Sequence, residues 1–303
     1  MHQQYSFGAA LQASQRINWQ VDDIIGGEHR LDFSRRFMPE SLARVEELRF
    51  LSTDEKRILN QIRGYGYLYM FGLVEEFILP YVLDHARAQL DTDDLRTRAY
   101  LQFAGEEAKH IHLFKRFREA FDADFGTPCA VIGTPQEIAK VVLSHDRLSV
   151  ALLILHIEWM SQRHYLDSIK DDHALDPHFK SLLKHHWMEE AQHAKLDTLM
   201  VAELAKDRSA ESLAAAVDGY LTLGGIFDGA VLQQTKFDME TFMQVTGRKL
   251  NEAEQGQFMQ VQHQAQRWTF IGSGISHPNF LATVRDIAPG AEQKLAEVAP
   301  AFA

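Results

Sequence analysis

The five-residue pattern Glu-Glu-Ala-x-His occurs twice in the chain, with Glu107 and His110 in one copy and Glu190 and His193 in the other. Residues three apart on an α-helix lie on the same face, so each copy places a carboxylate beside an imidazole. Such a pair can bind one metal ion together. Single Glu-x-x-His pairs are common on helix surfaces, but two identical copies favour two facing helices with metal ligands between them.

The segments around both copies have helical periodicity and few turn signals. Strand alternation bounded by turn residues is essentially absent, which indicates an all-α protein. Ser52 and Glu55 form a capping-box sequence, and Pro135 and Pro177 occupy first helical positions. With Thr92 as a further cap, we predict four long helices, at about 54–88, 93–121, 135–170 (interrupted near 144–146) and 177–206.

Further helices are expected on both sides of this bundle. Residues 1–50 are predicted to form an N-terminal arm with one short helix. After the bundle, the sequence predicts a helix at 209–223, a break at Gly224-Gly225, and helices at 226–245 and 251–271. Since no linker composition separates these parts, we predict one domain over 1–303, with a bundle core at about 54–206 covered by C-terminal helices at 209–272.

The other two bundle helices must supply glutamates if the bundle holds a metal pair. Glu158 stands alone in an apolar segment, where an unpartnered carboxylate would be costly to bury. In the first helix there are two candidates, Glu75 and Glu76. Glu76 is the predicted ligand, because a helical wheel places it near the direction of five apolar and aromatic residues of the same helix: Ile58, Ile62, Tyr65, Tyr69 and Leu83. Glu76 and Glu107 are 31 residues apart, and Glu158 and Glu190 are 32 apart, as expected for two antiparallel helix pairs.

One more histidine belongs to the same face of the fourth helix. His186 lies four residues before Glu190 and seven before His193, so the three share one stripe. His112, His156 and His164 point away from the ligand stripes and are expected to have structural roles. Glu106 and Glu189, the first glutamates of the two patterns, are expected to contact the ligands from outside or to lie on the surface.

Composition limits the partners and the metal. Lys and Arg total 31 against 42 Asp and Glu, and the net charge of −11 argues against nucleic acid or an anionic membrane as partner. The one cysteine, Cys129, leaves no thiolate cluster, so a metal would be held by nitrogen and oxygen. Low cysteine content and the absence of a recognisable signal sequence predict a cytoplasmic protein.

These residues resemble the ferritin-like di-iron proteins, and the third histidine resembles the arylamine N-oxygenases of antibiotic biosynthesis. The resemblance covers about residues 55–205 and implies a ferritin-like four-helix bundle. It implies two Fe ions, with Mn/Fe as the alternative pair, and O₂ as co-substrate. The implied ligands are three histidines and four carboxylates, with no catalytic residues beyond them: Glu76, Glu107, His110, Glu158, His186, Glu190 and His193.

The resemblance implies an oxygenase that acts on a small organic molecule, with an amine as the expected substrate. No flavin or nicotinamide fingerprint is present, so an external donor such as a reductase or ferredoxin must supply electrons. The alternatives are a Mn/Fe or di-iron ligand-binding oxidase with a fatty-acid-like ligand, and a ferroxidase or iron-handling protein. A helical protein in which the two patterns are coincidental is a further alternative. Long amphipathic helices also allow a homodimer.

Overall fold

The structure is a computed structural model that describes residues 5–88, 90 and 93–303. Within these ranges the regular elements are helices, and β-pairing is limited to two isolated bridges. The all-α prediction is therefore confirmed.

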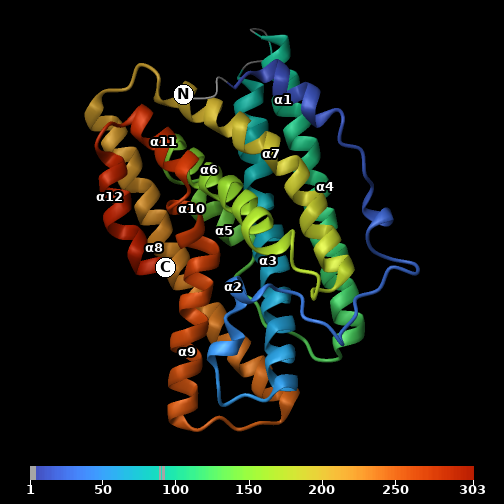
Figure 1. The fold of residues 1–303 in the computed structure, drawn as a ribbon. Coiled ribbons are helices and arrows are strands. Elements are labelled where there is room, and N and C mark those ends of the chain that lie inside the picture. The colour runs from blue at the N-terminus through green and yellow to red at the C-terminus, as the bar shows by residue number, and fades with distance from the viewer. Residues whose placement is uncertain (1–4, 89, 91–92) are drawn as a thin grey trace.

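Four long helices form the bundle that the sequence predicts (Figure 1). They are α3 (Thr53–Arg87), α4 (Asp94–Phe125), α6 (Arg147–Arg163) and α7 (Pro177–Ala205). Helix α3 packs along α4, and α6 packs along α7. Helix α3 begins as predicted, because the Ser52 side chain accepts from Glu55 N and the Glu55 carboxylate accepts from Ser52 N.

The predicted interruption of the third helical segment is confirmed, because the chain forms two helices there, α5 (Pro135–Val142) and α6, with residues 143–146 between them. Helix α6 continues into the π-helix η3 (His164–Ile169), which ends within one residue of the predicted end. One boundary differs from the prediction. Helix α4 runs four residues beyond its predicted end and stops where Gly126 adopts a left-handed conformation. The predicted cap Thr92 lies outside the described residues; Asp93 accepts a hydrogen bond from Arg96 N at the start of α4.

The N-terminal segment lies along the outside of α4 and α7 (Figure 1). It contains two α-helices, α1 (Phe7–Ser14) and α2 (Glu40–Ala43), and the 3-10 turns η1 (Val21–Asp23) and η2 (Val45–Glu47). Trp19, between α1 and η1, is buried. The arm therefore contributes to the protein core over α4 and α7.

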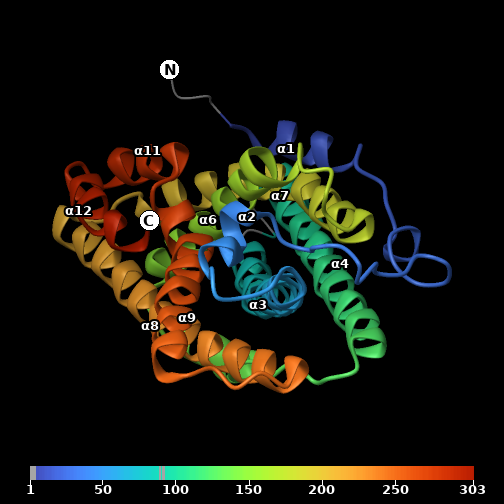
Figure 2. The ribbon, with the colours of Figure 1, turned by 60° about the horizontal axis from the view of Figure 1, so that its bottom comes forward.

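On the other side of α3 lie the helices that follow the bundle (Figure 2). Helix α8 (Ala210–Thr246) is continuous, so the predicted break at Gly224-Gly225 is wrong. Two glycines cost a helix only about 1 kcal/mol each, and packing against α3, α6 and α9 outweighs that cost. The chain then forms α9 (Glu252–Arg267), the π-helix η4 (Trp268–Gly272), α10 (Ser273–Ile275), α11 (Pro278–Ile287), α12 (Ala291–Val298) and η5 (Ala299–Phe302).

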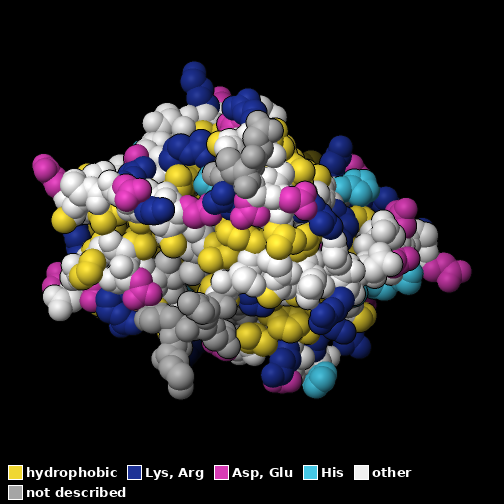
Figure 3. Space-filling model, turned by 90° about the horizontal axis from the view of Figure 1, so that it is seen from above, with side chains coloured by type: hydrophobic (Ala, Val, Ile, Leu, Met, Phe, Trp, Pro, Cys, Tyr) yellow, Lys and Arg dark blue, Asp and Glu magenta, His cyan; other side chains and the backbone are white. Residues whose placement is uncertain are grey.

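Two helices are long and apolar enough to meet the length and hydropathy criteria for a membrane span. The apolar window of α3 is 78% buried in the bundle, whereas that of α8 is 28% buried. Core helices of proteins outside membranes meet the same criteria, so this is weak evidence for a membrane. On the face in Figure 3, hydrophobic side chains lie between basic and acidic ones, and Lys and Arg are dispersed.

Candidate metal centre

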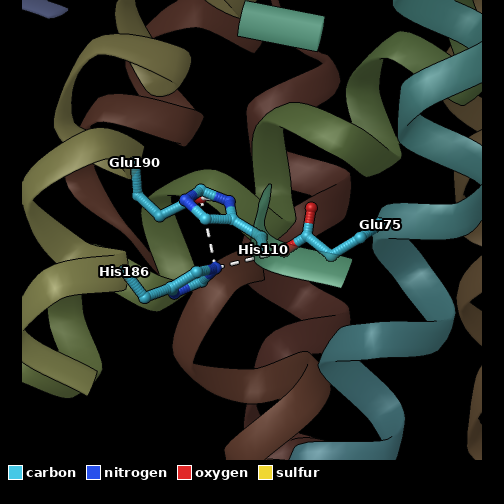
Figure 4. A group of neighbouring side chains, drawn as sticks. All are labelled: Glu75, His110, His186 and Glu190. Carbon is cyan, nitrogen blue, oxygen red and sulfur yellow. Dashed lines mark hydrogen bonds and ion pairs between the residues drawn. The ribbon is translucent and has the colours of Figure 1, made fainter. Parts of the chain in front are cut away.

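Two overlapping groups of histidines and glutamates lie buried inside the bundle. The first contains Glu75 from α3, His110 from α4, and His186 and Glu190 from α7, which converge in Figure 4. In the second, Glu107 and His193 join His110 and Glu190. Within each group the potential ligand atoms lie within 4.8 Å of one another. The two Glu-Glu-Ala-x-His copies therefore face each other, as predicted.

The distances place nitrogen and oxygen atoms around a common space. His193 Nδ1 lies 2.8 Å from Glu107 Oε1 and 3.3 Å from Glu190 Oε1. His110 Nδ1 lies 3.1 Å from Glu190 Oε1. His186 Nε2 lies 3.1 Å from Glu75 Oε1 and 3.2 Å from Glu190 Oε1. One oxygen of Glu190 thus lies close to all three histidines.

Several of these atoms are buried without a hydrogen-bond partner among the described residues. They include Nδ1 of His110 and of His193, Oε1 of Glu190 and both carboxylate oxygens of Glu107. Buried polar groups in proteins nearly always have a partner, so a cluster of such atoms needs an explanation. Metal ions between the nitrogens and oxygens would satisfy all of them.

The second nitrogen of each pattern histidine is held by a glutamate from the opposite copy. His110 Nε2 donates to Glu189 Oε2 at 2.9 Å, and His193 Nε2 donates to Glu106 Oε2 at 2.8 Å. These contacts leave both Nδ1 atoms as acceptors that face the common space. Lys109 Nζ donates to Glu189 Oε1 at 2.5 Å, which fixes that carboxylate. A carboxylate behind a histidine is the usual arrangement around a bound metal, because it sets the ring orientation.

The structure corrects the choice in the first helix. Glu75 is 2% exposed and contacts His186, whereas Glu76 is half-buried and belongs to neither group. The helical wheel does not distinguish Glu75 from Glu76, because α3 is buried on almost every side and has no single apolar face. Tyr69, which helped to define the predicted inner face, donates to Ile132 O of the loop before α5 instead.

Glu158, the predicted ligand from α6, is buried and interacts with Glu190, but it belongs to neither of the two groups. It is 1% exposed, and neither of its carboxylate oxygens has a hydrogen-bond partner among the described residues. Burial and the nearby charge of Glu190 raise the pKa of the Glu158 carboxyl well above its ordinary value. A bound cation would offset that cost.

Sequence analysis did not identify Asp197 as part of this region. Asp197 lies four residues after His193 on α7, is 1% exposed, and has an unpartnered Oδ2. Burial, together with the charges of Glu107 and Glu190, raises the pKa of its carboxyl. The sequence does contain a signal for this residue, because the helical spacing places Asp197 one turn beyond His193 on the face that carries His186 and Glu190.

The electrostatics of the cluster are strongly coupled. Burial alone would lower the pKa of His110, but the nearby carboxylates of Glu189 and Glu190 outweigh it and raise the pKa to about 9. The same balance raises the pKa of His193. For His186, burial dominates over the charge of Glu190 and lowers the pKa to about 4. The carboxylates around His110 and His193 thus separate the pKa values of these two residues from that of His186.

Aromatic rings surround the cluster and limit the access of water. Phe103 stacks on the His193 ring at 3.9 Å, and Phe71 meets the His186 ring edge-on at 5.3 Å. Trp19 of the N-terminal arm lies parallel to the His110 ring at 6.3 Å. Lys109 Nζ lies 3.9 Å from the Trp19 ring centroid. The arm therefore closes the bundle over His110.

The donor set suits a pair of iron or manganese ions. It consists of imidazoles and carboxylates without sulfur, and such ligands favour Fe and Mn over thiolate-seeking metals. Five of the seven predicted ligands lie in the two groups, and Glu158 interacts with Glu190. Two other histidines have the structural roles expected of them. His156 bonds to Tyr220, and His164 bonds to Tyr67 and Ser273.

Comparisons with known proteins agree with this geometry. The family model described as p-aminobenzoate N-oxygenase AurF matches residues 5–263. Among solved structures, an R2-like ligand-binding oxidase variant with an anaerobically reconstituted Mn/Fe cofactor has 14% sequence identity and a TM-score of 0.50. A second variant of that oxidase, with an Fe/Fe cofactor, has 15% identity and a TM-score of 0.49. Each comparison covers 95% of both chains.

No curated protein matches the chain. The likeness to the first of these oxidases shows a common ferritin-like fold. The family match extends over most of the sequence, from the N-terminal arm through the bundle and into α9. The chain therefore belongs to the p-aminobenzoate N-oxygenase AurF family, and it is an oxidoreductase with a ferritin-like helical bundle.

Proposed function

We propose that the protein is an O₂-dependent oxygenase that transfers oxygen to the nitrogen of a small amine. The observation that carries this proposal is the buried cluster of three histidines and three glutamates, with polar atoms that lack hydrogen-bond partners among the described residues. Glu75, Glu158 and His186 would complete the metal site that the two sequence patterns begin. A pair of iron ions, or a Mn/Fe pair, would supply electrons to O₂ when bound there.

The protein's own residues would set the geometry and exclude water. Glu106 and Glu189 hold His193 and His110 with Nδ1 directed inward. Phe71, Phe103 and Trp19 cover the ligands with apolar surface. A dry, rigid site protects reactive oxygen species from side reactions.

Turnover would need electrons from a second protein, which we propose to be a reductase or ferredoxin, because the sequence has no flavin or nicotinamide fingerprint. We also propose that the protein is cytoplasmic, as its single cysteine favours, and that it binds neither nucleic acid nor membrane, which the net charge of −11 supports. We further propose that the chain forms a homodimer, which its long amphipathic helices allow.

The test is single-turnover oxidation of an aryl amine. Protein loaded with Fe²⁺ under argon is mixed with ¹⁸O₂ and aniline, and the product is analysed by mass spectrometry. We expect a hydroxylamine or more oxidised product that carries ¹⁸O on nitrogen. The double variant Glu107→Ala/Glu190→Ala should form none.

Other outcomes would favour the alternatives. Fe²⁺ oxidation without any oxidised amine, followed by retention of many Fe³⁺ ions, would indicate a ferroxidase. A Mn/Fe pair with a co-purified fatty-acid-like ligand would indicate a ligand-binding oxidase. The solved structure with a TM-score of 0.50 is the specific reason to measure both metals.

A further inference from the structure

An apolar cavity of about 160 Å³ lies where α6, α8 and the C-terminal helices meet. All of its lining residues except His156 and Tyr220 are glycines or have apolar side chains. Its wall includes the exposed Gly225 of α8 and the buried Phe270 of η4, so the cavity extends from the protein surface into the interior. An apolar cavity of about 150 Å³ stays dry and binds xenon. This cavity therefore suits a small apolar molecule.

The two polar side chains of the wall use their hydrogen-bond donors on the protein itself. His156 Nε2 lies 3.3 Å from the carbonyl oxygen of Phe270 and donates to it. Nδ1 of the neutral ring then accepts a hydrogen bond from the Tyr220 hydroxyl at 2.7 Å. Burial keeps the ring neutral, because it lowers the pKa of His156 to about 4. A water molecule needs at least two polar partners, so the wall favours an apolar guest.

Two phenylalanine rings separate this cavity from the metal ligands. The Phe270 ring in the cavity wall lies 6.4 Å from that of Phe71, and the Phe71 ring lies 5.3 Å from that of His186. Rings at such centroid distances are in contact, which leaves no room between them for an aromatic guest. Side chains fluctuate within picoseconds to nanoseconds, and a diatomic molecule is small enough to pass during these fluctuations. The contact between cavity and centre therefore selects guests by size.

We propose that this cavity is a chamber that takes up O₂ from the solvent and passes it between Phe270 and Phe71 to the metal centre. The choice of O₂ rests on the function proposed above, since an oxygenase must admit O₂ to a site that excludes water. O₂ is uncharged and has no hydrogen-bond donor, so it moves from water into apolar space as other apolar molecules do. An aryl amine is too large to pass the two rings and must approach the centre from another side.

Xenon is the probe for the chamber, because it is apolar and heavy enough to be located in a crystal. Crystals of the metal-loaded full-length protein are pressurised with xenon, and its position is read from anomalous scattering. Gly224→Leu fills the cavity, because a Cβ at Gly224 meets open space and this residue lines the wall. Gly229→Leu is the matched control, since Gly229 lies on the same helix, also faces open space, and does not line the cavity. We expect xenon in the cavity of the wild type and of Gly229→Leu, and none in Gly224→Leu.

The delivery of O₂ is measured by stopped-flow mixing of the ferrous full-length protein with O₂ in the absence of any amine. We expect Gly224→Leu to lower the second-order rate constant at least about threefold, the effect of returning one methylene-sized apolar group to water. Gly229→Leu should react at the wild-type rate, because it leaves the chamber open. For the wild type, xenon should slow the reaction relative to helium at the same pressure, since xenon competes with O₂ for the chamber.

Ordered water in place of xenon in the wild-type cavity would overturn the proposal, as would equal O₂ rate constants for the wild type and Gly224→Leu. If Gly224→Leu misfolds, the competition in the wild type still decides, because equal rates under xenon and helium contradict the chamber. Failure of the protein to oxidise aniline would contradict the proposed function and leave the xenon result unaffected. Aniline oxidation combined with an empty cavity under xenon would support that function and overturn the chamber.

Discussion

At the scale of single residues, the centre is defined by which atom of each side chain faces inward. His110 and His193 each use one nitrogen for an outer glutamate and leave the other for the common space. The residue types and the pairing of Glu107 with His110 could be predicted from spacing alone. The choice between Glu75 and Glu76 could not, because a helix buried on nearly all sides has no single apolar face to orient a wheel.

Glu75 and Glu76 are adjacent in α3 and therefore offer a matched test of which one is the metal ligand. Glu75→Ala removes a carboxylate that contacts His186, so we expect metal content to fall from about two ions per chain to about one. Glu76→Ala should retain the wild-type content. Inductively coupled plasma mass spectrometry of both variants, purified in parallel, measures this. Equal loss in the two variants would contradict the assignment.

Glu106 and Glu189, which bind the outer nitrogens of His193 and His110, should affect the affinity for metal and leave the number of bound ions unchanged. Glu106→Ala frees His193 Nε2, and we expect about 10- to 100-fold weaker binding of the metal, the usual cost of removing such a partner. Competition with a chromogenic chelator gives the affinity. The exposed Glu119 on the same helix supplies the control Glu119→Ala, for which we expect no change. An unaltered affinity in Glu106→Ala would show that this contact does not orient the histidine.

His164 should make stability depend on pH. Burial lowers its pKa to about 3, from an ordinary value of 6.5. The folded state then binds fewer protons than the unfolded state between these values, so stability falls as pH drops from about 6.5 toward 3. At pH 5 the loss amounts to about 2 kcal/mol.

The measurement compares thermal unfolding at pH 7 and pH 5. His164→Gln should show a smaller drop in melting temperature over this interval than the wild type. The exposed His173 provides the control His173→Gln, which should behave as the wild type. The account of His164 is wrong if His164→Gln and the wild type lose the same stability.

At the scale of elements, the helix starts after Ser52 and at Pro135 and Pro177 agree with the prediction, whereas the two π-helices and the continuity of α8 do not follow from local sequence signals. The capping boxes and first-turn prolines rest on local chemistry, so they could be found in the sequence. The two π-helices, η3 and η4, and the continuous α8 depend on tertiary packing. At Gly224-Gly225 the local sequence favours a break, but the helix continues. Both glycines line the cavity between α6, α8 and the C-terminal helices.

The N-terminal arm acts on the centre through Trp19. Trp19→Ala would remove the ring that lies parallel to His110, and we expect metal loss to a chelator to become about tenfold faster because water gains access. Trp19→Phe keeps an aromatic cover and should stay near the wild-type rate. Stopped-flow mixing with EDTA measures the rate, and circular dichroism verifies folding. A wild-type rate in Trp19→Ala would mean that the arm does not shield the site.

At the scale of the whole molecule, two helix pairs meet around one metal centre. The bundle could be predicted from the sequence, whereas the packing of the segments around it could not. The repeat of spacing from α3 to α4 and from α6 to α7 made the bundle predictable. The cavity was not predictable, since its walls come from α6, α8 and the last helices, which are distant in sequence. Its apolar lining could be recognised only after these segments were placed together.

The central claim is that the buried cluster holds two metal ions. Metal analysis of the purified wild type and of Glu107→Ala/Glu190→Ala tests it most directly. The account predicts about two ions of iron, or of iron plus manganese, per wild-type chain, and almost none in the double variant. A wild type that binds no transition metal, or a double variant that binds as much as the wild type, would contradict it.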